Sequence, residues 1–281
     1  MKAPPFAYVR ARSLAEAFEL LERHGPGAKL LAGGQSLIAA LNLRLASPDV
    51  LIDISRIREL AGIRIAEGKV RIGALTTHAE IERSGEIAAN APLLAQAAPH
   101  IAHPAIRNVG TLGGSLATAD PAAEWPACCV ALDAEFVVAA KNGSRHVRAR
   151  DFFKGVYATD LRPGEILTGI EFPASGPSHA SAFLELAMRR GDYAIVGIAA
   201  VARKTNGTLR DVNLAYLGAG ETPILARTAM AVAESGRPAA DVAAALAADL
   251  RPWPDLYTSA ATKLHLARVL TGRALAALGA P

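Results

Sequence analysis

Apolar residues in the first part of the chain follow helical and strand spacing in turn. Ser13 stands three residues before a glutamate, as in a capping box, and the apolar positions after it predict a helix that ends near His24. Short apolar runs at 29–32 and 50–54 predict buried strands, and the segment 37–45 between them has a helical pattern. This order predicts a small α/β unit whose glycine turn follows a strand, where ligands commonly bind.

The middle of the chain alternates apolar and polar residues in segments that predict β-hairpins. The first hairpin turns at Glu67–Gly68, and the second turns at Asn142–Gly143, a dipeptide that strongly favours hairpins. The predicted segments are a hairpin at 62–72, strands at 135–140, 144–148 and 165–172, and helices at 77–83, 91–101 and 122–132. This unit is expected to form a mixed sheet with helices packed on it.

Proline, glycine and serine at 173–178 form the best candidate linker, and a domain boundary is placed there. The segments predicted beyond it are strands at 181–188, 195–204 and 209–217 and helices at 222–234, 239–248 and 258–278. Asn206–Gly207 is predicted to close the last two strands into a hairpin. The predicted fold class is α+β. An N-terminal domain of residues 1–176, with subdomains of about 1–58 and 59–176, precedes a smaller α+β domain of residues 177–281 with an antiparallel sheet and helices.

Composition narrows the class of protein. The chain has 281 residues and 51% hydrophobic content, enough to bury sizeable cores, and its formal charge of +4 comes from scattered basic residues. Few aromatic side chains are available to stack on bases, so nucleic-acid binding is not expected. The N-terminus lacks the apolar core of a signal peptide, and the longest apolar run, near 193–202, is about half of the ~20 residues that span a bilayer. We expect a cytoplasmic protein without stable membrane insertion.

Cysteine and histidine do not indicate a metal centre. Cys128 and Cys129 are adjacent in an apolar run, which predicts buried thiols, and two neighbouring cysteines cannot build an iron–sulfur site alone. The spacings of His78, His100 and His103 do not match those of zinc sites, so we assign them structural roles. No Ser-His-Asp or Cys-His set can be assembled, and no catalytic residue is named.

Two glycine pairs, Gly33–Gly34 and Gly113–Gly114, are the feature that folding alone explains least. Ser36 follows the first pair, and Thr111 and Ser115 flank the second. Glycine lets a backbone approach a ligand without a Cβ atom, and successive N–H groups in such a turn bind anions. Neither stretch fits the Rossmann or P-loop patterns. Together they are suited to grip the two phosphates of one dinucleotide.

The Ala-Gly-Gly-Gln-Ser and Thr-Leu-Gly-Gly-Ser stretches, about eighty residues apart, resemble the FAD-binding medium subunits of molybdenum-containing hydroxylases. Aerobic carbon monoxide dehydrogenase and xanthine dehydrogenase belong to this family. The resemblance extends over nearly the whole chain and implies a PCMH-type N-terminal domain in which both stretches embrace the FAD pyrophosphate. The residues that inherit this role are Ala32, Gly33, Gly34, Gln35, Ser36 and Leu37 in the first stretch and Thr111, Gly113, Gly114 and Ser115 in the second.

The resemblance implies four further contacts with FAD. Glu124 stands where relatives place an acidic residue that bonds the ribityl hydroxyls, and Ile101 and Leu167 stand at positions that touch the flavin. Tyr193 corresponds to a residue that covers one face of the isoalloxazine ring. Simpler explanations remain open. They are a surface glutamate for Glu124, core packing for Ile101 and Leu167, and a strand-end tyrosine in a hinge for Tyr193.

Two other acidic residues are given no contact with the cofactor. Asp120 precedes Pro121 and is expected only to cap the helix that follows. Relatives often carry lysine where Glu185 stands, so no role is assigned to Glu185.

By the same resemblance, the chain is expected to be the FAD-carrying electron-transfer subunit of a molybdenum hydroxylase-type dehydrogenase. It would take electrons from a 2Fe–2S small subunit, which receives them from a molybdenum–pterin centre on a large subunit, and pass them to an external acceptor. A dimer of heterotrimers is expected. Two alternatives are a stand-alone FAD-dependent oxidase or dehydrogenase and a scaffold subunit without FAD. The C-terminal domain is short for the first, and the intact glycine pairs argue against the second.

Overall fold

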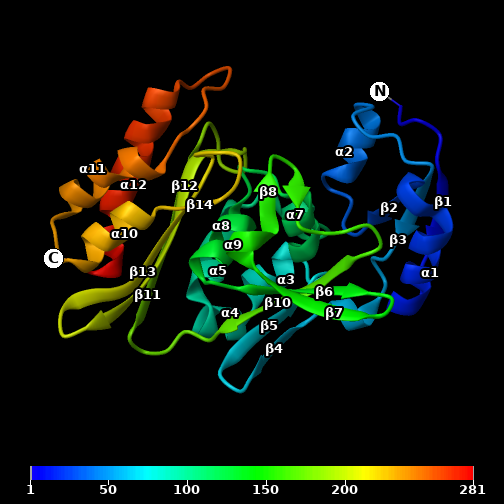
Figure 1. Cartoon of the computed structure of the whole chain (residues 1–281), viewed down its shortest axis with the longest axis horizontal. Coiled ribbons are helices and arrows are strands. Elements are labelled where there is room, and N and C mark those ends of the chain that lie inside the picture. Colours follow the sequence, from blue (N-terminus) through cyan, green and yellow to red (C-terminus); the bar gives the residue numbers. More distant parts are fainter. Residues whose placement is uncertain (1, 281) are drawn as a thin grey trace.

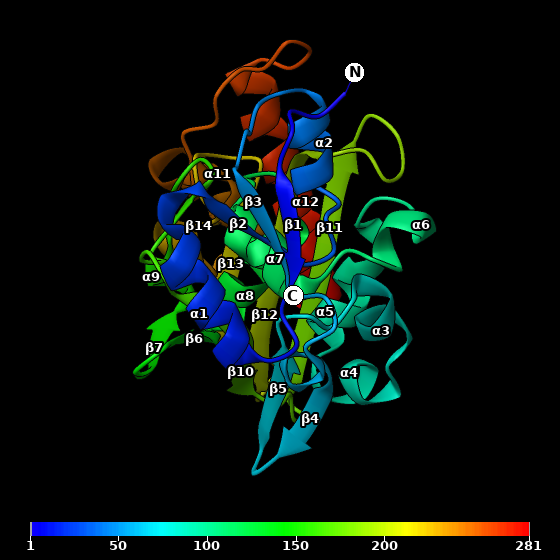
Figure 2. The same cartoon turned by 90° about the vertical axis from the view of Figure 1, so that its right-hand side faces the viewer.

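The N-terminal lobe is built on the strands that the early apolar runs predict. In the computed structural model, which describes residues 2–280, three short parallel strands pair in the order β1-β3-β2. Figure 2 shows α1 beside these strands and α2 at their upper end. The elements of the lobe are β1 (Ala7–Arg10), α1 (Leu14–His24), β2 (Ala28–Leu31), α2 (Leu37–Asn42) and β3 (Val50–Asp53). Apolar side chains from α1 and β3 fill a small core of its own.

The ends of α1 and α2 refine the predicted boundaries. Ser13 Oγ accepts a hydrogen bond from the N–H of Glu16 at 3.2 Å, as the spacing predicts. The Glu16 carboxylate, however, accepts from the N–H of Arg12 at 2.7 Å rather than from Ser13. The helix predicted at 37–45 ends at Asn42, because Arg44 has a φ of 58° and cannot continue a right-handed helix.

The five-stranded sheet at the centre of the molecule joins both predicted hairpins to one later strand (Figure 1). Its order is β4-β5-β10-β6-β7, and its pairs are antiparallel. The mixed sheet expected for this unit is therefore wrong, and the parallel pairs lie in the separate sheet of the N-terminal lobe. The strands are β4 (Ile63–Ala66), β5 (Lys69–Gly73), β6 (Glu135–Ala140), β7 (Gly143–Arg148) and β10 (Ile166–Pro173), with a small hairpin of β8 (Phe153–Gly155) and β9 (Ala158–Thr159) before β10.

Short helices pack around this sheet, and α4, α6 and α7 are not anticipated by the apolar pattern. These helices span at most two turns, too few to show a clear period. Ser84 ends α3 and also caps α4, because its hydroxyl accepts from the N–H of Ile87 at 3.2 Å. The predicted helix 122–132 begins only at Glu124. The helices are α3 (His78–Arg83), α4 (Gly85–Asn90), α5 (Pro92–Ala97), α6 (Pro104–Arg107), α7 (Leu112–Thr118), α8 (Glu124–Ala131) and α9 (Ala149–Phe152).

The C-terminal region forms an antiparallel sheet with helices packed on it, as predicted, but the sheet has a fourth strand that the prediction lacked. The expected hairpin at Asn206–Gly207 joins β12 to β13. The helix predicted at 222–234 is partly wrong, because Ile224–Leu225 pairs with β13 as a strand and the helix starts at Arg227. The elements are β11 (His179–Ala187), β12 (Ala194–Thr205), β13 (Thr208–Leu217), β14 (Ile224–Leu225), α10 (Arg227–Glu234), α11 (Ala239–Asp249) and α12 (Ala260–Leu278).

The C-terminal sheet shares its two faces between two cores. One face packs against α10 and α12, and the other contacts α5 and α8, so that Phe183 and Leu217 join the core of the central region. α8 is buried along its whole length, including the free thiols of Cys128 and Cys129, as expected. A helix that is apolar on all sides suits this place between layers. Among the described residues, no helix is long and apolar enough to cross a membrane.

Candidate functional site

Gly33 and Gly34 form the turn between β2 and α2, and each is glycine for a different reason. Gly34 has a φ of 70°, which glycine adopts without strain. At Gly33 a Cβ atom would stand 2.2 Å from the carbonyl oxygen of Val109 and 2.8 Å from the Cα atom of Gly110. The first glycine stretch therefore rests on the backbone that leads into the second. The structure places the two stretches side by side.

The N–H groups from Gly33 to Leu37 form an open run at the start of α2. Within residues 2–280, none of these five N–H groups has a protein acceptor. The turn is closed by other bonds, because Gln35 Nε2 donates to the carbonyl of Gly33 at 3.1 Å and the N–H of Ile38 donates to that of Gly34 at 2.9 Å. Ser36 makes no side-chain capping bond, so its hydroxyl remains available. Such a run attracts anions, phosphate among them.

The second glycine pair is not an open turn, and this part of the expectation is wrong. Gly113 and Gly114 lie in the first turn of α7, where the Thr111 hydroxyl accepts from the N–H of Gly114 at 3.2 Å. The N–H groups of Leu112, Gly113 and Ser115 are also occupied, by carbonyls at 2.8–3.1 Å. A Cβ at Gly113 would stand 2.4 Å from that of Ala74, so close packing explains this glycine. The stretch can offer a ligand the Ser115 hydroxyl rather than a run of N–H groups.

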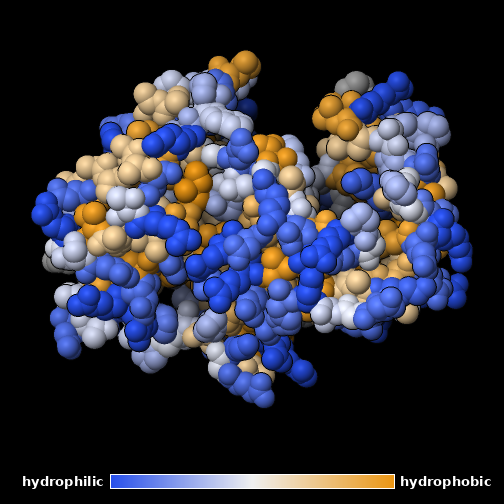
Figure 3. Space-filling view, viewed as in Figure 1, coloured by the Kyte–Doolittle hydropathy of each residue, from blue (hydrophilic) through white to orange (hydrophobic). Residues whose placement is uncertain are grey.

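Both stretches border a deep notch in the surface of the molecule. Figure 3 shows the notch in the upper edge, between the N-terminal lobe and the rest of the chain, and Figure 1 places α2 on one side of it and α7 on the other. A Cβ at Gly114 would point across to Ala32 at 3.9 Å. A partly open pocket of about 160 Å³ lies elsewhere, between the central region and the C-terminal sheet, where Leu93 and Val201 line it. We favour the notch as the site, because the polar groups gather there.

The carboxyl group of Glu124 is buried among other acidic groups. Only 8% of the residue is exposed, so the alternative of a surface glutamate is wrong. Burial raises the pKa of Glu124 to about 8, and the carboxylates of Glu185 and Asp120 add to the rise. A buried carboxyl group stays in the fold at least cost when it has hydrogen-bond partners. Hydroxyl groups of a ligand would supply such partners.

Asp120 lies beside this carboxyl but does not cap α8, contrary to expectation. Its Oδ1 accepts from the N–H of Ala122 at 2.9 Å, within the loop, and the helix starts only after Ala123. Its Oδ2 accepts from the hydroxyl of Tyr157 at 3.4 Å. Asp120 therefore ties the loop before α8 to the β8–β9 hairpin.

Sequence reasoning missed the place of Glu185, to which it gave no role. Glu185 projects from β11 toward the central region, where its Oε1 lies 3.3 Å from Nδ1 of His100. Its other carboxylate oxygen is buried without a hydrogen-bond partner. Residues this far apart in the sequence carry no local pattern that marks their pairing. Glu185 and His100 meet because β11 packs on α5, which His100 follows in the chain.

Ile101 lies in a loop that the structure fixes firmly. The buried guanidinium of Arg107 donates to the carbonyl of Ile101 at 3.0 Å and to that of Ala102 at 3.1 Å. A Cβ at Gly191 would stand 2.8 Å from the carbonyl oxygen of Ala102. The segment that leads to Tyr193 therefore lies directly on the Ile101 loop.

Tyr193 and Leu167 differ in their surroundings. Tyr193 is 74% exposed, and its pKa is raised by partial desolvation and then by Asp120 and Glu124, so its hydroxyl lies near both carboxyl groups. Leu167 is buried in the central core, opposite Val138 of β6. The structure brings Tyr193 to the acidic group, while core packing already accounts for Leu167.

His78 has a structural partner, as proposed. Trp125 Nε1 donates to His78 Nδ1 at 2.9 Å, inside the core. Burial, and then the charge of Arg107, lowers the pKa of His78 to about 4, so the ring is neutral near pH 7. A neutral imidazole can accept the indole N–H bond.

A group with the spacing of metal ligands lies on the central sheet, away from the notch. Glu135, His146 and Glu171 offer ligand atoms within 4.8 Å of one another. Glu171 is already paired with Arg71 at 3.0 Å and with Lys69 at 3.4 Å. These cations satisfy the carboxylate, and we interpret the group as an ion-pair network.

Comparison with known proteins identifies the family. Residues 4–175 match the family model described as the FAD binding domain in molybdopterin dehydrogenase, and residues 181–278 match the CO dehydrogenase flavoprotein C-terminal domain. The chain is 39% identical over 281 residues to the 6-hydroxypseudooxynicotine dehydrogenase complex subunit alpha of Paenarthrobacter nicotinovorans, covering 98% of this chain and 95% of the relative. It is 38% identical over 282 residues to the carbon monoxide dehydrogenase medium chain of Hydrogenophaga pseudoflava, covering 98% and 97%.

A solved structure agrees with these sequence matches. A chain of carbon monoxide dehydrogenase from Hydrogenophaga pseudoflava, in a form that lacks the Mo-pyranopterin moiety of its molybdenum cofactor, is similar with a TM-score of 0.96 and 39% identity over 99% of this chain and 98% of that one. Quinoline 2-oxidoreductase from Pseudomonas putida 86 gives a TM-score of 0.93 at 37% identity, covering 99% and 98%. The predicted α+β fold class is confirmed. The chain belongs to the FAD-binding medium subunits of molybdenum hydroxylase-type dehydrogenases.

Proposed function

We propose that this chain is the FAD-carrying electron-transfer subunit of a multi-subunit dehydrogenase. It takes electrons from a partner subunit with a 2Fe–2S cluster and passes them to an external acceptor, while a large partner subunit holds the molybdenum–pterin centre and the substrate. Its relatives are named as medium chains or subunits of such dehydrogenases, which supports a heteromeric assembly. A dimer of heterotrimers is our proposal for that assembly.

The observation that carries the proposal is the run of five N–H groups from Gly33 to Leu37 beside the notch. These groups, with the hydroxyls of Ser36 and Ser115, would hold the pyrophosphate of FAD, with Ala32, Gln35, Thr111, Gly113 and Gly114 shaping the same wall. The residues fit the group, since the concavity is open and Gly33 leaves no room for a side chain.

The remaining site residues would hold the ribityl and ring parts of FAD. Glu124 would accept hydrogen bonds from the ribityl hydroxyls, which suit a buried carboxyl group. Tyr193 would cover one face of the isoalloxazine ring, and Ile101 would line its other surroundings. Leu167 would pack in the core behind the isoalloxazine ring. FAD, when bound, supplies the redox chemistry, and these residues bind it, orient it and exclude water.

We assign the electron source to other chains because of the acidic residues beside the notch and the position of the two cysteines. The acidic groups beside it, Asp120, Glu124 and Glu185, are accounted for by ligand hydroxyls and by His100 and Tyr157. The two cysteines are buried in α8, too deep to bind a cluster at the surface. Within the described residues, these features support a subunit that receives electrons.

The test is anaerobic addition of candidate substrates to the purified chain reconstituted with FAD. Carbon monoxide, an aldehyde, a purine and an N-heterocycle should each leave the flavin absorbance unchanged. The same chain, co-expressed with the subunits encoded beside it, should form a complex that contains molybdenum, iron and FAD, in which one of these substrates bleaches the flavin.

Two results would overturn the proposal. Rapid bleaching of the flavin in the isolated chain would identify a stand-alone FAD-dependent dehydrogenase or oxidase. A complex that assembles and turns over without FAD in this chain would identify a scaffold subunit.

A further inference from the structure

Tyr157 combines a strained backbone with an exposed aromatic ring. It is the second residue of the two-residue turn between β8 and β9, and its φ is 54°. Glycine or asparagine occupies such positions at lower cost, and a bulky residue there is unusual. The residue is nevertheless 65% exposed, so packing within the chain does not repay the strain. Backbone strain of this kind gathers at functional sites.

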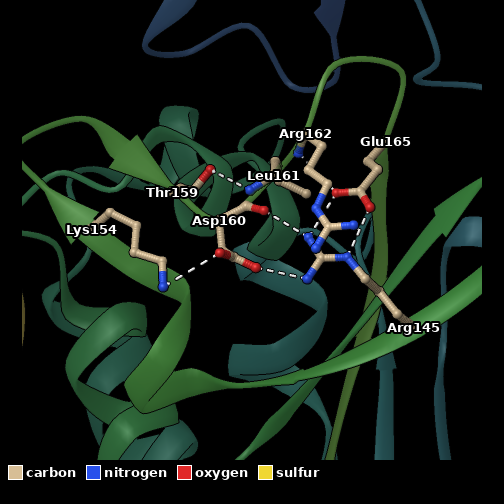
Figure 4. A network of polar contacts seen from close by, with 7 residues as sticks. All are labelled: Arg145, Lys154, Thr159, Asp160, Leu161, Arg162 and Glu165. Carbon is tan, nitrogen blue, oxygen red and sulfur yellow. Dashed lines mark hydrogen bonds and ion pairs between the residues drawn. The ribbon is translucent and has the colours of Figure 1, made fainter.

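The turn is held in place from both sides. The N–H of Tyr157 donates to the carbonyl of Ala119, at 3.2 Å, and Ala119 is itself left-handed with a φ of 53°. At the base of the hairpin, Arg145 binds Glu165 at 2.7 and 2.8 Å and Asp160 at 2.7 Å, as Figure 4 shows. The ring therefore projects from a fixed base.

A third contact aims the side chain toward the candidate cofactor site. Asp120 accepts from the Tyr157 hydroxyl at 3.4 Å. The phenol of Tyr193 lies close enough to contribute to the raised pKa of Tyr157, which is due first to partial desolvation and then to Asp120. Tyr193 is coupled in turn to Asp120 and Glu124. Two exposed tyrosines therefore share one acidic group, and β9, next to the turn, packs against α7 at the notch.

We propose that Tyr157 is a second aromatic contact for the isoalloxazine ring of FAD, oriented by its hydrogen bond to Asp120. This inference rests on the proposed function. Exposed rings that flank a site suit a planar ligand, because an aromatic contact in offset or edge geometry stabilises both partners. Such a contact would account for the exposed ring and would offset the strain of the turn, which contacts within the chain do not.

The experiment separates the ring from the turn. Tyr157→Gly and Tyr157→Asn remove the ring and suit a left-handed backbone, whereas Tyr157→Phe keeps the ring. Glu67→Gly is the matched control, because Glu67 is an exposed turn residue with a φ of 53° in the β4–β5 hairpin. Each variant, as the full chain, is titrated with FAD, and its flavin fluorescence and its Tm without FAD are measured.

If the ring contacts the flavin, Tyr157→Gly and Tyr157→Asn should weaken FAD binding about three- to tenfold. Flavin fluorescence should rise, since a nearby tyrosine quenches the excited flavin by electron transfer. The Tm without FAD should be no lower than that of the wild type, because the strain is removed. Tyr157→Phe should bind FAD within about twofold of the wild type, and Glu67→Gly should change only the Tm.

Three outcomes have distinct meanings. If the wild-type chain binds no FAD, the proposed function fails. If the wild type binds FAD and the glycine and asparagine variants keep its affinity and fluorescence, the inference about Tyr157 is wrong. If those variants lose only the rate of flavin reduction in the assembled complex, Tyr157 contacts a partner protein instead, and the inference is again overturned.

Discussion

Gly33 is the residue where the two halves of the candidate site touch. A Cβ at this position would meet the backbone of Val109 and Gly110, so Gly33→Ala must push the first glycine stretch away from the second. We expect the variant to fold with a lower Tm and to lose most of its FAD affinity. Spectrophotometric titration with FAD, together with thermal unfolding, measures both effects.

Gly85→Ala is the control for this substitution. Gly85 is exposed at the start of α4, its φ is not left-handed, and a Cβ there would meet no neighbour within 4 Å. This variant should keep wild-type affinity and should be at least as stable as the wild type. An unchanged FAD affinity in Gly33→Ala would show that the close contact between the stretches does not shape the site.

Glu124 should make the stability of the FAD-free chain fall as the pH rises. The unfolded chain releases the Glu124 proton near pH 4.5, whereas the folded chain holds it until about pH 8, so the folded state binds the extra proton between these values. The slope of the unfolding free energy in this window should be at most about 1.4 kcal/mol per pH unit. Urea unfolding at pH 5, 6.5 and 8 should show a flatter profile for Glu124→Gln. Parallel profiles for the two proteins would contradict this account.

At this scale the sequence named several residues of the candidate site, and their contacts with FAD stay predictions. The Gly33–Gly34 stretch and Glu124 were proposed by resemblance, and Tyr193 lies near the acidic group. Glu185 and the Asp120–Tyr157 bond were not found, because their partners come from distant elements. Such pairings depend on tertiary packing, which local patterns do not encode.

Arg145 of β7 forms ion pairs with the segment that follows the β8–β9 hairpin. Arg145 binds two carboxylates, and these bonds lower the pKa of both Asp160 and Glu165, although burial opposes the shift. The stabilisation from these ion pairs is complete when the pH is above the ordinary carboxyl pKa values near 4. It is lost as the pH falls through the lowered pKa values of the folded chain. Arg145→Met should therefore cost about 1–2 kcal/mol at pH 7, and the loss should shrink toward pH 3.

Arg237→Met provides the comparison, because Arg237 pairs with Asp241 at an exposed helix surface. Such a pair contributes about 0.5 kcal/mol or less. Chemical unfolding of both variants at pH 7 and pH 3.5 measures the difference. Equal losses for the two arginines would show that the Arg145 network acts as an ordinary surface pair.

Elements with strong local signals were predicted best. The hairpins at Glu67–Gly68 and Asn206–Gly207 are confirmed with the expected turn residues. The hairpin of β6 and β7 also forms, but its two-residue turn is Lys141–Asn142 rather than Asn142–Gly143, because Ala140 pairs with Gly143. The helices α4, α6 and α7 were missed, since they are held by caps and by contacts with the rest of the fold rather than by periodicity. α7 matters most here, because it changes how the second glycine pair can meet a ligand.

On the scale of the whole molecule, the proposed boundary near residue 176 separates two parts of the sequence that share one hydrophobic core. The family matches end at 175 and resume at 181, yet Phe183 and Leu217 belong to the central core. Residues 1–176 expressed alone should aggregate, because the apolar surface of α5 and α8 loses its cover. Co-expression with residues 177–281 should restore a soluble pair, detected by size-exclusion chromatography. A soluble 1–176 fragment that melts cooperatively would show that the two domains fold independently.

Burial protects the thiols of Cys128 and Cys129 from the peroxide that a reduced flavin can produce. A reduced flavin that meets dioxygen releases peroxide, which attacks thiolates, and burial raises the pKa of both thiols so that they stay protonated and out of reach. Met188, 66% exposed just before the Arg189–Tyr193 segment, is the most accessible sulfur among residues 2–280. After long turnover in air, peptide mass spectrometry should find sulfoxide at Met188 and intact thiols in α8. Oxidation would then modify an exposed surface residue and leave the packing of the core unchanged.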